Sequence, residues 1–268
     1  MSATATSDID VRSASRHAFL AVLRRDLYVT GRELPAFFAQ VILQPLFLLF
    51  VFGKILTSLG YARAGYAELL FPGIMALTLV ITGVQAIAFP LVAEFGWTRE
   101  IEDRLLAPMS TVLVAVEKVV FASLRAITAA TVMLPVGILV LGSIPWRWEA
   151  IPLFVAVVVL GALVGAGIGL VIGTHVPPTK IQIVFALVFT PLLFTGSSQY
   201  PWPSLSHLRW FQVVTALNPM TYVSEGMRAA LVPQVPHIQP WISVTVLVVA
   251  VTVLMTIGMR GFRRRAIT

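Results

Sequence analysis

The chain has 268 residues, of which 58% are hydrophobic and only 12% are charged, with a mean hydropathy of +0.90. These values exclude an ordinary soluble domain and predict a protein inserted in a lipid bilayer. The net charge of +7 lies mainly in the segments between apolar runs, which indicates membrane topology and no nucleic-acid partner.

The N-terminal 30 residues divide into two parts. Residues 1–11 are rich in Ser, Thr and Ala and are predicted to be disordered, which leaves 12–268 as a single membrane domain. Between 12 and 30, apolar residues recur at helical spacing, whereas Arg24 and Arg25 lie elsewhere on the helix. This pattern predicts a basic amphipathic helix in the headgroup plane. It would serve either as an anchor for the first span or as a lever that contacts a cytoplasmic partner.

Six apolar runs follow, and they predict an all-α integral membrane protein with six transmembrane helices. The runs cover about 36–56, 69–93, 119–141, 151–173, 181–196 and 242–259. The fifth run has only 16 residues, fewer than the roughly 20 that a straight helix needs to cross a bilayer.

The distribution of basic residues sets the expected orientation. With the N-terminus inside, thirteen of the 19 Lys and Arg residues fall in inner segments and five in outer segments. This is the positive-inside bias, so we expect both termini in the cytoplasm. A multi-pass protein of this kind is expected in the plasma (inner) membrane of a bacterium.

A stripe of glycines marks the fourth run. Gly161, Gly165, Gly169 and Gly173 are each four residues apart. Small residues on one helical stripe let another helix approach closely. The partner is expected to be a helix of the same chain, with a subunit interface as the alternative.

The segment between the fifth and sixth runs is amphipathic and rich in proline and aromatic residues. It predicts short re-entrant helices, because polar backbone at membrane depth must be surrounded by protein or by a water-filled cavity. Asn218 is expected to cap the helix that Pro219 begins. Glu225 and Arg228 follow three residues apart and either pair with each other or face water.

The loop between the second and third runs carries clustered acids, which depart from the positive-inside trend. Residues 97–110 combine an apolar stripe with alternating charges. A short helix of this kind is suited to docking in a groove of another protein, and a solvated loop is the alternative.

Charge within the spans is sparse. Glu94 and Lys118 lie near span ends and are expected to extend toward the interface. Arg125 lies deeper and is expected either to extend inward or to pair with a carboxylate such as Glu94 or Glu117. The poverty of buried acids argues against an ion-driven mechanism.

Catalytic patterns are missing from the sequence. It contains no phosphate-binding loop, no metal-ligand spacing and no nucleophile–base arrangement that could be argued, and it contains no cysteine. We therefore expect no enzyme activity, no metal site and no cofactor in this chain, and any energy source must lie in a partner.

Three segments together closely resemble the permease subunits of the ABC-2 type transporter family, in particular the daunorubicin-resistance and nodulation-export branch. They are Phe71-Pro72-Gly73-Ile74-Met75, the stretch 99–118 (REIEDRLLAPMSTVLVAVEK), and 195–228 with its core LNPMTYVSEGMR. The resemblance covers roughly residues 12–260. It implies two permeases, identical or related, paired with two P-loop ATPase subunits that bind ATP and Mg.

The resemblance also implies roles for individual residues. The helix 99–110 would couple the permease to the ATPase, with Arg99, Glu100, Glu102, Asp103, Arg104, Arg24 and Arg25 as candidate contacts. A substrate path along the first, second and fifth spans would be lined by Gln40, Gln44, Phe47, Phe185, Phe189 and Phe194. Apart from the resemblance, the amphipathic segment between the fifth and sixth runs suggests a gate or pocket, and the candidates for an outer gate are Asn218, Pro219, Glu225 and Arg228.

The expected function is export of an amphipathic or hydrophobic substrate, such as a drug, antibiotic or lipid-like molecule, driven by the separate ATPase. One alternative is a permease for polysaccharide or glycolipid export from the same broad family. Another, from a different class, is a secondary transporter that needs no partner.

Overall fold

The computed structural model describes residues 3–61, 65–96, 110–142 and 148–267, and side chains from residue 15 to 266. Its longer helices are α1 (Ala3–Arg32), α2 (Leu34–Leu48), α4 (Tyr66–Gly96), α6 (Thr111–Leu141), α7 (Ile151–His175), α8 (Ile181–Thr195), α10 (Pro219–Leu231) and α11 (Pro240–Ile267). Shorter elements are the π-helix η1 (Leu49–Ile55), α3 (Leu56–Ser58), α9 (Arg209–Ala216) and the 3-10 turns η2 (Trp148–Ala150), η3 (Pro178–Lys180) and η4 (Trp202–His207). No strand occurs in the described ranges.

Within these ranges, six helical segments are long and apolar enough to cross a membrane, which confirms the predicted number of spans. They are Leu34–Ser58, Tyr66–Gly96, Thr111–Leu141, Trp148–His175, Pro178–Thr195 and Pro240–Ala266. In the most apolar window of each segment, 78% of the residues are buried in α4, but only 11% in the segment that contains α8. The second span is therefore the centre of the bundle, and the fifth span lies at its edge.

The glycine stripe of α7 packs against α4, so its partner is a helix of the same chain. A Cβ on Gly165 would lie 2.5 Å from the carbonyl oxygen of Val80, and one on Gly169 would lie 2.7 Å from that of Val84. Both distances are far below an ordinary carbon–oxygen contact. The two backbones approach this closely only because side chains are missing along the stripe.

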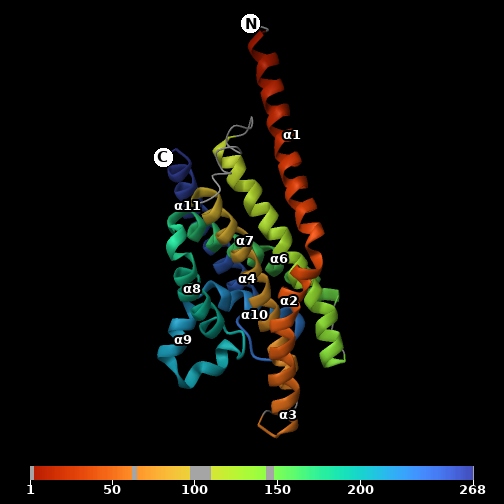
Figure 1. The fold of residues 1–268 in the computed structure, drawn as a ribbon. Coiled ribbons are helices and arrows are strands. Elements are labelled where there is room, and N and C mark those ends of the chain that lie inside the picture. Colours follow the sequence, from red (N-terminus) through yellow and green to blue (C-terminus); the bar gives the residue numbers. More distant parts are fainter. Residues whose placement is uncertain (1–2, 62–64, 97–109, 143–147, 268) are drawn as a thin grey trace.

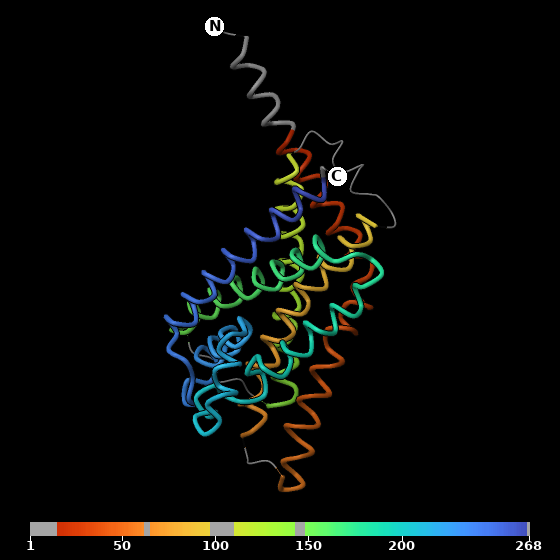
Figure 2. Tube along the Cα trace, turned by 90° about the vertical axis from the view of Figure 1, so that its left-hand side faces the viewer, coloured from red at the N-terminus to blue at the C-terminus, as the bar shows by residue number. Residues whose placement is uncertain are grey.

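Both chain termini lie at the same end of the bundle, as an even number of crossings requires (Figures 1 and 2). The side of the membrane to which this end belongs stays a prediction from the distribution of charge. Helix α1 extends beyond the bundle and runs in roughly the same direction as α6 (Figure 1). It begins at Ala3 and so includes most of the segment for which composition predicts disorder. Its placement in the headgroup plane stays a prediction.

Charged side chains at the span ends are buried, contrary to the expectation that they extend toward the interface. Lys118 Nζ donates to Glu94 Oε1 at 2.5 Å, and both side chains are less than a tenth exposed. Glu117 beside them is fully buried. Glu94 and Glu117 are thus acids buried inside the protein. The charge of Lys118 offsets the cost of removing the Glu94 carboxylate from water.

The segment between α8 and α11 folds back against the bundle. Helix α9 is largely exposed, whereas α10 is buried along nearly its whole length, against α4, α7 and α11. Both helices lie toward the end opposite the termini (Figure 1). The predicted short helices are therefore present, and their re-entrant placement in a membrane stays a prediction.

Candidate functional site

The pair formed by Glu225 and Arg228 lies at the centre of a buried polar cluster in α10. Both residues are fully buried, and Arg228 Nη1 donates to Glu225 Oε1. The same carboxylate accepts the backbone N–H of Trp202 and that of Ile238, each at 2.9 Å. This arrangement excludes the alternative in which both side chains face water, and it ties the segments on either side of α10 to the helix.

A sharp turn after α8 supplies the remaining partner of this cluster. Arg228 Nη2 donates to the carbonyl oxygen of Ser197 at 3.0 Å. Ser197 has a φ of 50°, the left-handed region that non-glycine residues rarely adopt. Ser224 Oγ holds the neighbouring carbonyl of Gly196 at 2.7 Å. The turn is therefore fixed by side chains of α10.

Gly73 explains why this turn can lie directly on α4. A Cβ at Gly73 would collide with the backbone of Ser198. The glycine of the Phe71-Pro72-Gly73 motif thus makes room for the turn, a role that was not predicted. The sequence gives no signal for it, because the contact joins residues 125 positions apart.

Asn218 caps α10 as predicted. Its Oδ1 accepts the backbone N–H of Met220 at 2.9 Å, and Pro219 is the first helical residue. Its Nδ2 also donates to Thr195 Oγ1 at 3.0 Å and to the carbonyl of Pro191 at 3.3 Å. One side chain therefore begins α10 and joins it to the end of α8.

Burial and hydrogen bonding oppose each other in setting the charge state of this cluster. Burial raises the pKa of Glu225, and the charge of Arg228 with two backbone N–H groups opposes that rise. Burial also raises the pKa of the Tyr200 hydroxyl to about 12, so this hydroxyl stays protonated and donates to the carbonyl of Phe194 at 2.5 Å.

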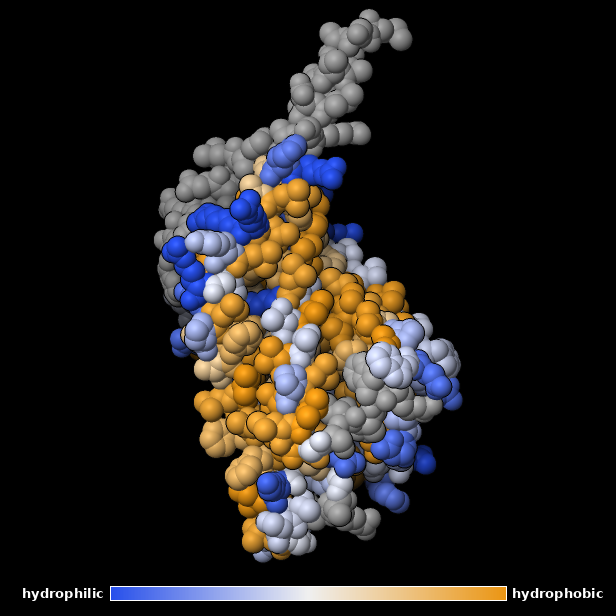
Figure 3. Space-filling model, turned by 90° about the vertical axis from the view of Figure 1, so that its right-hand side faces the viewer, coloured by the Kyte–Doolittle hydropathy of each residue, from blue (hydrophilic) through white to orange (hydrophobic). Residues whose placement is uncertain are grey.

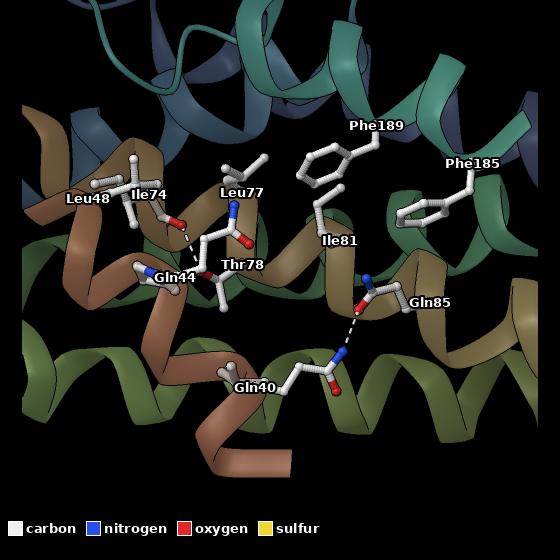
Figure 4. A pocket seen from close by; sticks show the side chains of 12 residues that line it. Gln40, Gln44, Leu48, Ile74, Leu77, Thr78, Ile81, Gln85, Phe185 and Phe189 are labelled. Atoms are coloured by element: carbon white, nitrogen blue, oxygen red, sulfur yellow. Dashed lines mark hydrogen bonds between the residues drawn. The ribbon is translucent and has the colours of Figure 1, made fainter. Parts of the chain in front are cut away.

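A cavity of about 150 Å³ lies between α2, α4 and α8. Four of the six residues predicted for the substrate path line it, namely Gln40, Gln44, Phe185 and Phe189. Figure 4 shows side chains from the three helices meeting around this space. Two polar residues of α4 that were not predicted, Thr78 and Gln85, also line it. Gln85 Oε1 accepts a hydrogen bond from Gln40 Nε2 at 3.4 Å (Figure 4).

Aromatic rings form one wall of this cavity. Phe185 stacks on Phe189 with centroids 5.8 Å apart, and Phe89 of α4 lies 5.0 Å from Phe185. The two other predicted path residues lie elsewhere. Phe47 is 58% exposed and does not line the cavity, and Phe194 lines a separate apolar groove together with Asn218 and Pro219. Phe194 follows Phe189 by five residues and therefore lies on another face of α8. Phe47 follows Gln44 by three residues, so helical spacing alone predicts it on the cavity face, and its exposure corrects that prediction.

A second cavity, of about 230 Å³, adjoins the first and shares Gln40, Val41 and Gln85 with it. Arg125 of α6 lines this second cavity with Thr82 and Phe37. The Arg125 guanidinium lies 4.8 Å from the centre of the Phe37 ring. Arg125 therefore does not pair with Glu94, which is bound to Lys118, or with any other carboxylate in the described part of the chain.

The surface carries the pattern expected of a membrane protein. In Figure 3, one face shows a broad hydrophobic band, hydrophilic residues toward both ends, and a narrow strip of polar residues that interrupts the band. Gln40 and Gln44 are themselves exposed in the first span. Exposed amides at this depth require water or another protein surface beside them.

The structure describes two of the predicted ATPase contacts, and the others lie outside the described residues. Arg24 and Arg25 lie exposed on α1. Arg99, Glu100, Glu102, Asp103 and Arg104 lie outside the described residues. In the described part of the chain, no three His, Asp or Glu side chains gather as a metal site.

Comparison with known proteins decides the family. The sequence profile described as ABC-2 type transporter matches residues 17–232, which is most of the chain. The chain belongs to the ABC-2 type transporter family. Similar proteins include ycf38, provisionally named a transport permease, of Cyanophora paradoxa, which is 25% identical over 219 residues, 78% of this chain and 72% of its own length. The ycf38 protein of Porphyra purpurea is 26% identical over 229 residues, 82% of this chain and 72% of its own length.

The family match covers the two sites described above. The matched region contains the residues that line both cavities and the whole of α10. An ABC-2 permease is a transport subunit without catalytic groups of its own, and the family normally works with an ATPase. The membership extends to the family as a whole, and the daunorubicin-resistance and nodulation-export branch stays a prediction.

Proposed function

We propose that this ABC-2 type transporter chain is the permease of an ATP-driven exporter for amphipathic molecules. The observation that carries the proposal is the cavity between α2, α4 and α8, where amide groups face an aromatic wall within the membrane-spanning bundle. A site with both polar and aromatic walls suits a molecule with a polar and an apolar part.

The size of the cavities favours this substrate class over a polysaccharide. Volumes of about 150 and 230 Å³ accommodate a polar group with part of an apolar chain, whereas a sugar polymer needs a continuous channel. The exposed faces of α2 and α8 leave room for a second copy or a related permease to complete the path. We propose a dimer of permeases with two P-loop ATPase subunits, in a bacterial inner membrane with both termini in the cytoplasm.

In the proposed mechanism, the partner subunits hydrolyse ATP and this chain moves the substrate. ATP and Mg bind to the partner, and closure of the ATPase pair moves α1 and the segment 99–110. The first and fifth spans then shift, and the substrate leaves past α10. In this scheme Arg24, Arg25 and the charges of 99–110 transmit the force, and the cavity residues hold the substrate.

The experiment purifies the tagged chain from its host and reconstitutes the complex into inside-out vesicles. The expected result is a co-purified P-loop ATPase and ATP-dependent uptake of labelled amphiphiles. The variant Glu100→Ala/Asp103→Ala is expected to weaken ATPase association or to uncouple hydrolysis from uptake, with normal membrane insertion. Glu68→Ala/Glu149→Ala removes equal charge from exposed sites in α4 and η2 and serves as the control.

Two results would contradict the proposal. Uptake that follows an ion gradient and is indifferent to ATP would identify a secondary transporter. Wild-type association and coupling in the Glu100→Ala/Asp103→Ala variant would make the segment 99–110 a solvated loop.

A further inference from the structure

Arg125 occupies an unusual position for a charged residue. It is the fifteenth residue of α6, which has 31 residues, so it lies about 20 Å from either end of the helix at 1.5 Å rise per residue. Its guanidinium lies against Phe37, the fourth residue of the first span (Leu34–Ser58), so it sits within the bundle near the end at which that span begins. Ionisable residues inside a membrane protein generally face a cavity and act on a substrate, an ion or a partner charge.

The described residues around Arg125 leave its hydrogen-bonding capacity unused. The guanidinium lies against the face of Phe37, whose side chain carries no oxygen or nitrogen acceptor. Among the described residues, no carboxylate lies within 4.0 Å of the guanidinium; Glu33 acts on it only at longer range. A guanidinium carries five N–H donors in a fork that matches carboxylate and phosphate oxygens.

The cavity beside Arg125 is built of groups that complement an anion. Gln40, Gln85 and Thr82 line it with Arg125. The two amides share a single long hydrogen bond of 3.4 Å, so each keeps N–H donors for another partner. Phe89 lines the same cavity, and its ring lies tilted against that of Phe185, which lines the first one.

We propose that Arg125, with Gln40 and Gln85, binds the anionic group of the transported amphiphile, a carboxylate, phosphate or sulfate. The inference rests on the proposed export function and narrows its substrate class. The apolar part of the molecule lies along Phe89, Phe185 and Phe189, toward the first cavity. The charge of the substrate supplies the counter-ion that no described residue places within 4.0 Å of Arg125.

The same chemistry fits two sources, an exported amphiphile and the headgroup of an anionic lipid. Both would place an oxyanion against the guanidinium. They differ in whether the bound molecule leaves the site during ATP hydrolysis, and the experiment therefore measures binding and transport separately.

The binding experiment uses the full-length chain in nanodiscs of zwitterionic phosphatidylcholine. The probe is dansyl-labelled undecanoic acid, and its methyl ester is the neutral counterpart. We expect the wild type to prefer the acid by about tenfold, the usual scale for a charge-assisted hydrogen bond. Arg125→Gln is expected to abolish the preference, and Arg125→Lys to retain most of it. Arg209→Gln removes one exposed positive charge outside the cavities and is the matched control.

The possible outcomes distinguish failure of the anion site from failure of the proposed export function. Equal affinity of the wild type for acid and ester, or an unchanged preference in Arg125→Gln with normal thermal stability, overturns the anion site. Absence of ATP-dependent movement of any probe contradicts export but leaves a measured preference for the acid intact. Competition by phosphatidylglycerol in the nanodisc, without transport of the probe, assigns the site to a lipid headgroup.

Discussion

Two of the polar clusters in this bundle, one in α10 and one between α2, α4 and α6, differ in how completely their hydrogen bonds are made. In α10, the Glu225 carboxylate has one charged and two backbone donors, and Arg228 binds both that carboxylate and a backbone carbonyl. Between α2, α4 and α6, a single hydrogen bond of 3.4 Å joins Gln40 to Gln85, and the Arg125 guanidinium lies against an aromatic ring with no hydrogen bond or ion pair to another described residue.

The difference indicates two kinds of polar group in one membrane protein. Buried groups with matched partners stabilise the fold and leave little capacity for a ligand. Groups with unused donors beside a cavity contribute little to stability and are available to a substrate. Removing a residue of the first cluster should therefore affect folding, and removing one of the second should affect binding.

The largest effect is expected for Arg228→Met. The substitution leaves the buried Glu225 charge without its cation and the Ser197 carbonyl without a donor. Losing one partner of a buried pair costs about 3–5 kcal/mol of folding free energy. We expect a strongly reduced yield and midpoint of thermal unfolding in detergent. The double variant Glu225→Gln/Arg228→Met removes both charges and should recover part of the loss. Equal losses in the single and double variants would show that the pairing contributes nothing.

A smaller loss of stability is expected for Gly73→Ala. The added methyl group collides with the backbone of Ser198, so the turn after α8 must move away from α4. Overpacking of this kind costs about 1–3 kcal/mol. Gly31→Ala is the matched control, because a Cβ at Gly31 meets no atom within 4 Å. Thermal unfolding measures both, and a change of the same sign and size in both variants would contradict this role of Gly73.

Asn218→Leu should cost about 1 kcal/mol, the usual value of a lost helix cap, and should reduce export while ATPase association stays intact. Its side chain both caps α10 and holds α8, so its loss loosens the proposed outer gate. Asn218→Asp retains the acceptor for Met220 and loses the donors to α8, and is expected to unfold closer to the wild-type temperature. Unchanged export by well-expressed Asn218→Leu, measured in vesicles, would show that this segment is not the gate.

The sequence predicted the features that depend on local pattern. Runs of apolar residues identify spans because the bilayer fixes a minimum length. Asn218 was identified as a cap because a cap joins neighbouring residues, and the spacing of Glu225 and Arg228 indicated a pair on one face of a helix. Four of the six residues proposed for the substrate path line one cavity, but their role in transport stays a prediction.

The remaining features depend on contacts between distant segments. The backbone donors of Trp202 and Ile238 meet Glu225 only after two loops fold back on α10, and no periodic signal marks that event. Gln85 is a single amide within a long apolar run, so it was not identified before α2 and α4 came together. Lys118 and Glu94 looked separately placed at span ends, and their pairing was missed for the same reason.

The smallest effect on stability, and the sharpest separation of the two clusters, is expected for Gln85→Leu. The amide makes one long hydrogen bond to Gln40 beside a cavity, so its replacement by an apolar side chain should change the free energy of unfolding by less than about 0.5 kcal/mol. Binding of dansyl-labelled undecanoic acid should nevertheless weaken by about threefold to tenfold, the scale of one hydrogen bond. Gln182→Leu alters an exposed amide of α8 that lines neither cavity and should leave binding unchanged. A marked loss of stability with unchanged binding would place Gln85 with Glu225 and Arg228, among the groups that hold the fold together.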